Sequence, residues 1–345
     1  MNIPIASPDW DTTSLSDFLY LLSMSEIDQT VEVICIGMAV ADILVRGVST
    51  FPEDGVTSLV HDITISSGGD AVNEAITLSR LGHRVGLLAP VGDDVQGDFV
   101  ISECKKHGVD VSGVSRAAKY PTATSVVLIN DRGERSFLSQ PDSALDAFLL
   151  AERDVDRIKP GVKVVSLGSF FCGRGLHEGA LVSLLRKAKE VGATTVADFV
   201  LSPHAGGLKS IHHLLELVDY AAPSREEACV YAGTDNLDEI AEEFFRYGVK
   251  NVVIKQGGKG VFVRTKTDRF CLAPYPSSVV DTTGAGDSFV AGFISGLLRG
   301  EPLRGCVMIG AATASIAIQS IGATTGVRSF DQVMDVVRRH EVTVN

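Results

Sequence analysis

The chain has 345 residues, of which 45% are hydrophobic and 21% are charged, and its 34 glycines are ordinary for a globular α/β protein. This composition excludes a disordered or fibrous chain. The formal net charge of -12 disfavours nucleic acid and anionic membranes as partners, so an anionic nucleotide would have to be held by local devices such as helix N-termini and a divalent cation.

Two features of the sequence predict a cytoplasmic protein. The acidic first 30 residues carry one short apolar run, at 18–24, without a basic flank, so we expect neither a signal peptide nor a membrane span there. Residues 14–24 have the apolar spacing of a short amphipathic helix. The six cysteines are dispersed singly, which indicates reduced thiols rather than a disulfide framework or a zinc site.

From residue 31 the chain alternates short apolar segments with amphipathic ones, which predicts an α/β domain with helices on both faces of a sheet. Core strands are expected at 31–36, 85–89, 162–167, 194–198, 218–221, 252–254 and 260–263. Helices of period 3.6 are expected at 95–107, 176–191, 237–247, 287–299 and 303–319.

Two stretches, 43–65 and 122–138, instead alternate polar with apolar residues, as half-exposed strands do. The second contains the run Asn-Asp-Arg-Gly at 130–133, which predicts a hairpin turn. Strand pairs inserted in a wound α/β domain can form a small projecting sheet, and such projections often act as lids. We therefore predict a lid sheet with strands drawn from about 43–66 and 121–139.

The strongest local signal is the run DTTGAGD at residues 281–287, followed by an apolar helix. A glycine-rich turn that opens a helix points several backbone N–H groups and the positive end of the helix dipole at one place, which binds phosphate. Gly284 and Gly286 leave room for the phosphate.

The carboxylate of Asp287 is not needed by a phosphate cradle, but it suits a base that takes the proton of an acceptor hydroxyl during phosphoryl transfer. The alternative is that Asp287 only caps the helix. Two other glycine-loop interpretations are excluded, because the GxxxxGK[ST] pattern of a Walker A loop is absent and a dinucleotide fingerprint would need a glycine where Phe289 stands.

The sequence resembles the PfkB family of carbohydrate and nucleoside kinases. DTTGAGDSFVAGF, beginning at Asp281, is similar to the C-terminal signature of that family, and LGHRVGLLAPVGDDVQGDF at 81–99 is similar to its N-terminal signature. The resemblance covers roughly residues 31–330. It implies a ribokinase-like kinase domain at 31–340 after an N-terminal extension at 1–30, with a three-layer α/β/α fold, a mostly parallel central sheet and a small projecting β-sheet lid.

The resemblance implies that Asp287 is the catalytic base. It also implies that the backbone amides of Gly284, Ala285 and Gly286 form an anion hole for the transferred phosphate. Without the resemblance, capping remains an open alternative for Asp287.

The acceptor contacts implied by the resemblance fall on GMAVAD at 37–42 and GGDAVN at 68–73. Asp42 and Asn73 would bind acceptor hydroxyls, because a carboxylate accepts hydrogen bonds and an amide both donates and accepts them. Gly68 and Gly69 would let the sugar lie against the backbone. Each of these residues, taken alone, is also an ordinary turn residue.

The resemblance implies ATP and Mg²⁺ as cofactors. Residues 222–227 lie where the family has an Asn-x-x-Glu motif that organises Mg²⁺ through water; Glu227 matches it, whereas Ser224 replaces the asparagine and would contact the nucleotide through its hydroxyl. VVIKQGGKG at 252–260 is similar to the strand and turn beside the triphosphate, with Lys255 and Gly257 as nucleotide contacts. An ordinary surface lysine is the alternative for Lys255.

Many members of the family bind a monovalent cation such as K⁺ beside the anion hole. The resemblance places that site on Asp281 and Thr283, with the loop at 322–326 nearby.

We therefore predict an ATP-dependent kinase that phosphorylates a hydroxyl of a small sugar or sugar acid, and a homodimer formed through the lid sheet. A nucleoside kinase is the alternative within the same chemistry, with Phe137 as an aromatic contact for a base. A non-catalytic sugar or nucleotide sensor is the alternative of another class, because Ser224 departs from the motif.

Overall fold

The computed structural model describes residues 31–48, 50, 54–132, 134–170, 179–202 and 207–340. The chain divides into two units, Met1–Thr30 and Val31–Asn345, and all described residues belong to the second. The helix expected at 14–24 and Cys172 lie outside the described residues. In the described part, Cys35, Cys104 and Cys306 are buried free thiols.

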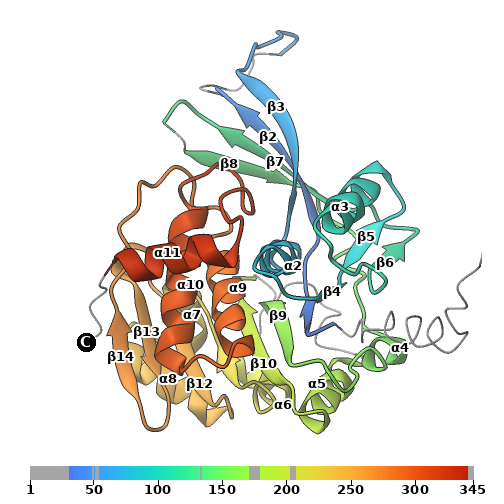
Figure 1. The fold of residues 1–345 in the computed structure, drawn as a ribbon. Helices are drawn as coiled ribbons and strands as arrows, with labels where there is room; N and C mark the ends of the chain where they lie inside the picture. Colours follow the sequence, from blue (N-terminus) through green and yellow to red (C-terminus); the bar gives the residue numbers. More distant parts are fainter. Residues whose placement is uncertain are drawn as a thin grey trace, which may run out of the picture. The chain divides into compact units, whose positions relative to one another are not determined.

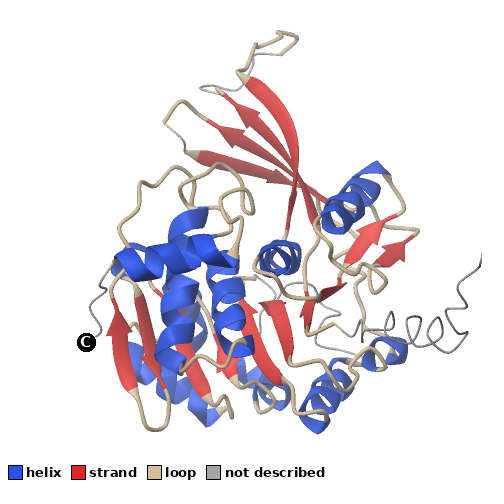
Figure 2. Cartoon of the chain, viewed as in Figure 1, coloured by secondary structure: helices blue, strands red, loops and turns tan. Residues whose placement is uncertain are grey.

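An eight-stranded central sheet has the strand order β14-β13-β12-β11-β10-β9-β1-β4. Figure 2 draws the strands in red and the helices in blue. Neighbours from β4 to β12 run parallel, and β13 and β14 are antiparallel to the strands beside them. All seven expected core strands are present, and β14 is an additional edge strand. The strands are β1 (Val33–Ile36), β4 (Val85–Leu88), β9 (Val164–Phe170), β10 (Thr194–Phe199), β11 (Tyr220–Ala221), β12 (Asn251–Lys255), β13 (Val261–Arg264) and β14 (Arg269–Leu272).

Helices cover both faces of this sheet, as the alternating pattern predicts (Figure 1). The helices whose apolar side chains join the core on one face are α2 (Asp70–Arg80), α3 (Val95–Lys106), α9 (Ala285–Leu298) and α10 (Leu303–Ala317). Those on the other face are α5 (Leu181–Glu190), α6 (His212–Leu215), α7 (Arg225–Ala232) and α8 (Leu237–Arg246). The remaining elements are β5 (Pro90–Gly92), β6 (Ser115–Ala117), α4 (Glu152–Val155), α11 (Phe330–Arg339) and two short 3-10 turns, Leu208–Ile211 and Gly257–Lys259.

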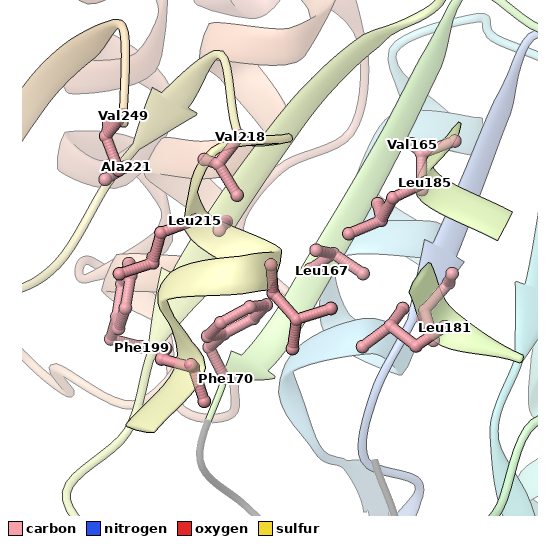
Figure 3. Packing of buried hydrophobic residues seen from close by; sticks show 14 of the residues in the cluster. Val165, Leu167, Phe170, Leu181, Leu185, Phe199, Leu215, Val218, Ala221 and Val249 are labelled. Carbon is pink, nitrogen blue, oxygen red and sulfur yellow. The ribbon is translucent and has the colours of Figure 1, made fainter. Parts of the chain in front are cut away.

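The inner strands are mostly apolar because both of their faces are buried. In β1, Val33 and Cys35 pack on the α2/α9 side, whereas Ile34 and Ile36 pack on the α5/α8 side. Figure 3 shows the second of these cores, in which Phe170 and Phe199 lie with ring centroids 5.4 Å apart. Among the described residues, no helix is both long and apolar enough to cross a membrane.

A second sheet of four strands has the order β3-β2-β7-β8, and we call it the small sheet. Its strands are β2 (Val40–Arg46), β3 (Asp62–Gly68), β7 (Ala123–Ile129) and β8 (Arg135–Ser139). The expected hairpin is present between β7 and β8. The two antiparallel pairs are joined through β2 and β7, which run parallel. In Figure 1 the small sheet extends away from α2 and α9.

The strand register gives the small sheet two different faces, because directly paired residues point to the same side. One face carries polar groups such as Asp42 and Arg135, and we call it the inner face. The opposite, outer face carries a row of aliphatic side chains. These are Ile43, Val45, Ile63, Ile65, Val126, Leu128 and Leu138, of which Ile63, Ile65 and Leu138 are exposed.

Candidate functional site

The predicted catalytic and acceptor-binding residues meet at the carboxyl edge of the parallel strands, where α2 and α9 begin. Ligands of open α/β sheets bind at this edge. The side-chain amide of Asn73, in the first turn of α2, donates to Oδ2 of Asp287, in the first turn of α9, at 2.7 Å. The fold therefore brings together two residues that lie 214 positions apart in the chain.

The DTTGAGD turn places its glycines at the start of α9. Gly284 is the N-cap residue with a φ of 70°, and a Cβ there would lie 2.5 Å from the Cβ of Ala323. Only glycine fits that conformation in that space. The amides of Gly284, Ala285 and Gly286 thus lie at the head of the helix, although the Ala285 amide also donates to the Thr282 carbonyl at 3.2 Å.

The carboxylate of Asp287 does not occupy the N-cap position, which belongs to Gly284. It accepts from Asn73 instead. Burial, together with the nearby Asp198 carboxylate, raises the pKa of Asp287 above its ordinary value, whereas the Asn73 amide and the Lys255 ammonium oppose this rise. A half-buried carboxylate with a raised pKa beside a helix N-terminus is suited to accept a proton.

Lys255, the last residue of β12, forms an ion pair with Asp198 in β10, and both side chains are largely buried. It is therefore not an ordinary surface lysine. Burial alone would lower the pKa of Lys255, but the carboxylates of Asp198 and Glu227 raise it above its ordinary value. A Cβ built on Gly286 would lie 3.2 Å from Lys255 Nζ, so the ammonium group faces the DTTGAGD turn.

Ser224 and Glu227 form a capping box at the start of α7. The Ser224 hydroxyl accepts from the Glu227 amide at 3.2 Å, and Oε2 of Glu227 accepts from the Ser224 amide at 2.7 Å. Burial and Asp198 raise the pKa of Glu227, whereas Lys255 opposes this. In the described part of the chain, no cluster of three or more His, Cys, Asp or Glu side chains is arranged to hold a metal ion.

The residues predicted to bind the acceptor, at the base of the small sheet, pack against one another. A Cβ on Gly68 would lie 2.1 Å from Oδ2 of Asp42, and a Cβ on Gly69, whose φ is 90°, would lie 2.5 Å from the Met38 carbonyl oxygen. Both glycines are thus required by the packing of the chain itself. Burial raises the pKa of Asp42 to about 6, and the charge of Arg135 opposes that rise.

Gly257 lies apart from this cluster in an exposed turn after β12, where a Cβ would meet nothing within 4 Å. Its role as a nucleotide contact stays a prediction. Asp281 and Thr283 lie in the turn before α9, where the guanidinium of Arg135 contacts both.

The structure places four further charged residues at the candidate site that were not singled out from the sequence: Asp70, Glu74, Arg135 and Asp198. In α2, Glu74 is buried and Asp70 is half-buried. Desolvation raises the pKa of each well above its ordinary value, strengthened by the charge of Asp287 on Asp70 and mainly by that of Asp198 on Glu74. Glu74 accepts a hydrogen bond from Ser166. Asp198 carried a usable signal, because a carboxylate that ends a buried strand needs a partner. Arg135 had no such signal.

Comparison with known proteins bears on the family and the fold of the chain. The family model described as "pfkB family carbohydrate kinase" matches residues 31–329. A 5-dehydro-2-deoxygluconokinase of Geobacillus kaustophilus is 30% identical over 285 residues, which cover 79% of this chain and 85% of that protein.

Two further comparisons involve ribokinases. A bifunctional ribokinase/ribose-5-phosphate isomerase A of Fructilactobacillus sanfranciscensis is 26% identical over 282 residues, and the match covers 80% of this chain but only 50% of that longer protein. A solved ribokinase of Arabidopsis thaliana, complexed with ribose and ATP, superposes with a TM-score of 0.75 at 23% identity, covering 90% of this chain and 99% of the other. The ribokinase-like α/β fold expected from the sequence is therefore confirmed.

Proposed function

Because the chain belongs to the pfkB family of carbohydrate kinases, we propose that it transfers the γ-phosphate of ATP to a hydroxyl of a small sugar or sugar acid, with Asp287 as the general base. The observation that carries this proposal is the contact of Asn73 with Asp287 at the N-terminus of α9. This contact brings three groups to one point: the carboxylate that would take the proton, an amide that can also bind the acceptor sugar, and a helix N-terminus that binds anions.

In the proposed step, the acceptor hydroxyl oxygen attacks the γ-phosphorus in line and its proton passes to the Asp287 carboxylate. The new P–O bond forms as the bond to the β-phosphate oxygen breaks, and ADP leaves with that electron pair. The amides of Gly284 and Gly286 and the ammonium of Lys255 stabilise the negative charge on the γ-phosphate oxygens. The raised pKa of Asp287 matches this role, because a base works best when its pKa approaches the working pH.

The residues present fit Mg²⁺ bound mainly by phosphates and water. Mg²⁺ keeps several waters and seldom uses an all-protein cage, which agrees with the finding that the described residues form no cluster of three or more ligands. Glu227 would hold the ion through water, and the ion would neutralise phosphate charge. Because the Ser224 amide already engages Oε2 of Glu227, the capping box orients this carboxylate.

Asp42 and Asn73 would bind hydroxyls of the acceptor, with the small sheet as a lid over them. Among the relatives, the 5-dehydro-2-deoxygluconokinase is named for a sugar acid and the ribokinase for a pentose, so the acceptor panel includes sugar acids, hexoses and pentoses. We also propose a homodimer through the outer face of the small sheet, since its aliphatic row is exposed in the single chain.

Acceptor-dependent ADP release over a panel of sugars, sugar acids and nucleosides tests the proposal. We expect turnover with at least one sugar or sugar acid, and loss of that turnover by a factor on the order of 10²–10⁴ or more in Asp287→Ala, with ATP binding retained. Turnover with nucleosides alone would favour a nucleoside kinase. ATP binding without turnover on any acceptor would favour a sensor, and near-native activity of the variant would exclude Asp287 as the base.

A further inference from the structure

One buried carboxylate holds the turn before α9 from three sides. Asp281 is 5% exposed; its Oδ1 accepts from the Thr283 amide at 2.9 Å, and its Oδ2 accepts from the Gly322 amide at 2.7 Å. The third partner is Arg135, whose Nη2 forms an ion pair with the same Oδ2. Asp281 therefore joins its own turn, the loop that begins at Gly322 and the inner face of the small sheet.

Arg135 contacts this turn at a second residue, Thr283. Its Nη1 donates to the hydroxyl of Thr283, and its side chain is 16% exposed. The planar guanidinium thus spans the two side chains, Asp281 and Thr283, that the family resemblance assigns to a monovalent cation. Bidentate contacts of this kind are characteristic of arginine rather than lysine.

These residues do not fit a monovalent cation while Arg135 is in place. A K⁺ ion would need the oxygens of Asp281 and Thr283, which already accept from the guanidinium. It would also stand within contact distance of the positively charged guanidinium, in a site where burial leaves little water to screen like charges. Displacing Arg135 instead would leave its charge half-buried without this partner.

We propose that Arg135 supplies from the small sheet the positive charge that a monovalent cation would otherwise supply, so that phosphoryl transfer by this chain does not depend on K⁺ or Na⁺. Arg135 is then a positioning residue: it braces the turn that carries Gly284 and Gly286, and it does so only while the small sheet lies over the site. This inference rests on the proposed kinase function.

Thermal unfolding tests whether the protein binds a monovalent cation, and it needs no acceptor substrate. The wild-type protein is melted in KCl, NaCl and tetramethylammonium chloride at equal ionic strength, because a bound ion raises the melting temperature by mass action. We expect the three melting curves to coincide. A selective rise in K⁺ that grows with its concentration would overturn the proposal, even if no acceptor were known.

Kinetics on the acceptor found by the panel test the role of Arg135. In Arg135→Met we expect kcat to fall about 10-fold or more, as for loss of one charge-stabilising group, and the melting temperature to fall as well, because the buried Asp281 carboxylate loses its charged partner. Guanidinium ion at millimolar concentration should restore part of the lost kcat. It has access, because a cavity of about 300 Å³ is bordered by Arg135, Val280 and Ile321.

The matched control is Arg132→Met, which removes a guanidinium from the same hairpin. Arg132 pairs only with exposed Glu134 among the described contacts, and its side chain is 78% exposed. This variant should keep wild-type kcat. If Arg135→Met fails to fold, Arg135→Lys carries the same comparison and should retain more activity than any uncharged substitution.

Two outcomes would overturn the proposal. One is a wild-type enzyme that K⁺ activates several-fold over tetramethylammonium. The other is an Arg135→Met enzyme with full kcat in tetramethylammonium. Absence of turnover on every acceptor would instead count against the kinase function itself, and the melting curves would still decide whether the cation binds.

Discussion

The side-chain amide of Asn73 donates to Oδ2 of Asp287, so the first turn of α2 sets the charge state of the carboxylate in the first turn of α9. This bond favours the ionised form, whereas burial and Asp198 favour the protonated form. The balance between them decides at which pH Asp287 is available as a base.

Removing the amide should shift the pH dependence of turnover. In Asn73→Ala the pKa of Asp287 rises further, so the acid limb of the kcat profile at saturating acceptor moves to higher pH, as expected for loss of a hydrogen bond that favours the ionised carboxylate. Activity is then lost more strongly on the acid side of the profile than on its plateau.

The control for this experiment is Asn251→Ala. In the wild type the side-chain amide of Asn251 donates to the Asp219 carbonyl, at the opposite end of β12 from Lys255. Its acid limb should match that of the wild type. An unchanged acid limb in Asn73→Ala would show that the amide does not tune Asp287.

Asp42 is predicted to cost stability at neutral pH. Its pKa is about 6 in the folded chain against an ordinary value of 3.8, so the folded state binds more protons than the unfolded state between these values, and stability falls as the pH rises through that window. Asp42→Asn should therefore gain up to about 3 kcal/mol of unfolding free energy at pH 8 and little at pH 4.

Urea unfolding at the two pH values measures this gain, and the KM for the acceptor should rise in the same variant because the carboxylate is lost. The exposed Asp131 in the turn of the β7–β8 hairpin provides the control, since Asp131→Asn should change neither quantity. A variant no more stable at pH 8 than at pH 4, relative to wild type, would contradict the assignment.

Replacing each of the two glycines of the turn by alanine should affect a different property, stability for Gly284 and ATP kinetics for Gly286. Gly284→Ala places a Cβ 2.5 Å from that of Ala323 at a φ of 70° and should destabilise the fold. Gly286→Ala should fold, because the nearest neighbour of its Cβ is the end of the Lys255 side chain at 3.2 Å, and Asp198 Oδ2 lies at an ordinary contact distance of 3.9 Å. It should nevertheless lower kcat/KM for ATP by a factor on the order of 10–100, since the methyl group stands where the phosphate approaches.

Gly300→Ala separates the cost of the positive φ from the cost of the steric clash, because Gly300 has a φ of 73° but a Cβ there would have nothing within 4 Å. Its cost should be about 1 kcal/mol from the backbone alone, less than that of Gly284→Ala. Melting temperatures and ATP kinetics of the three variants give the comparison, and wild-type kinetics in Gly286→Ala would count against the anion hole.

The outer face of the small sheet offers a direct test of the proposed homodimer. Ile65→Lys places a charge in the aliphatic row and should give a monomer, whereas Thr64→Lys, on the opposite face of the same strand, should leave a dimer. Analytical ultracentrifugation of the three proteins measures their masses. A wild-type protein that stays monomeric at high concentration would remove the proposal.

Much of the fold follows from local patterns. Central strands such as β1 and β4 are short apolar runs because both faces of the parallel sheet are buried, and helices such as α3 and α8 show the 3.6-residue spacing of a half-buried surface. The turn before α9 could also be predicted, since a glycine at a φ of 70° followed by an apolar helix depends only on neighbouring residues.

The partners of the charged side chains could not be predicted in the same way. The pairing of Lys255 with Asp198 and that of Arg135 with Asp281 join separate strands or sheets. Such pairs form because burial makes an unpaired charge costly, and which charges become buried together depends on the packing of the whole domain. The sequence by itself determined the phosphate-binding turn and the carboxylate of Asp287; only the tertiary structure decided that Asn73 holds that carboxylate and that a guanidinium braces the turn beside it.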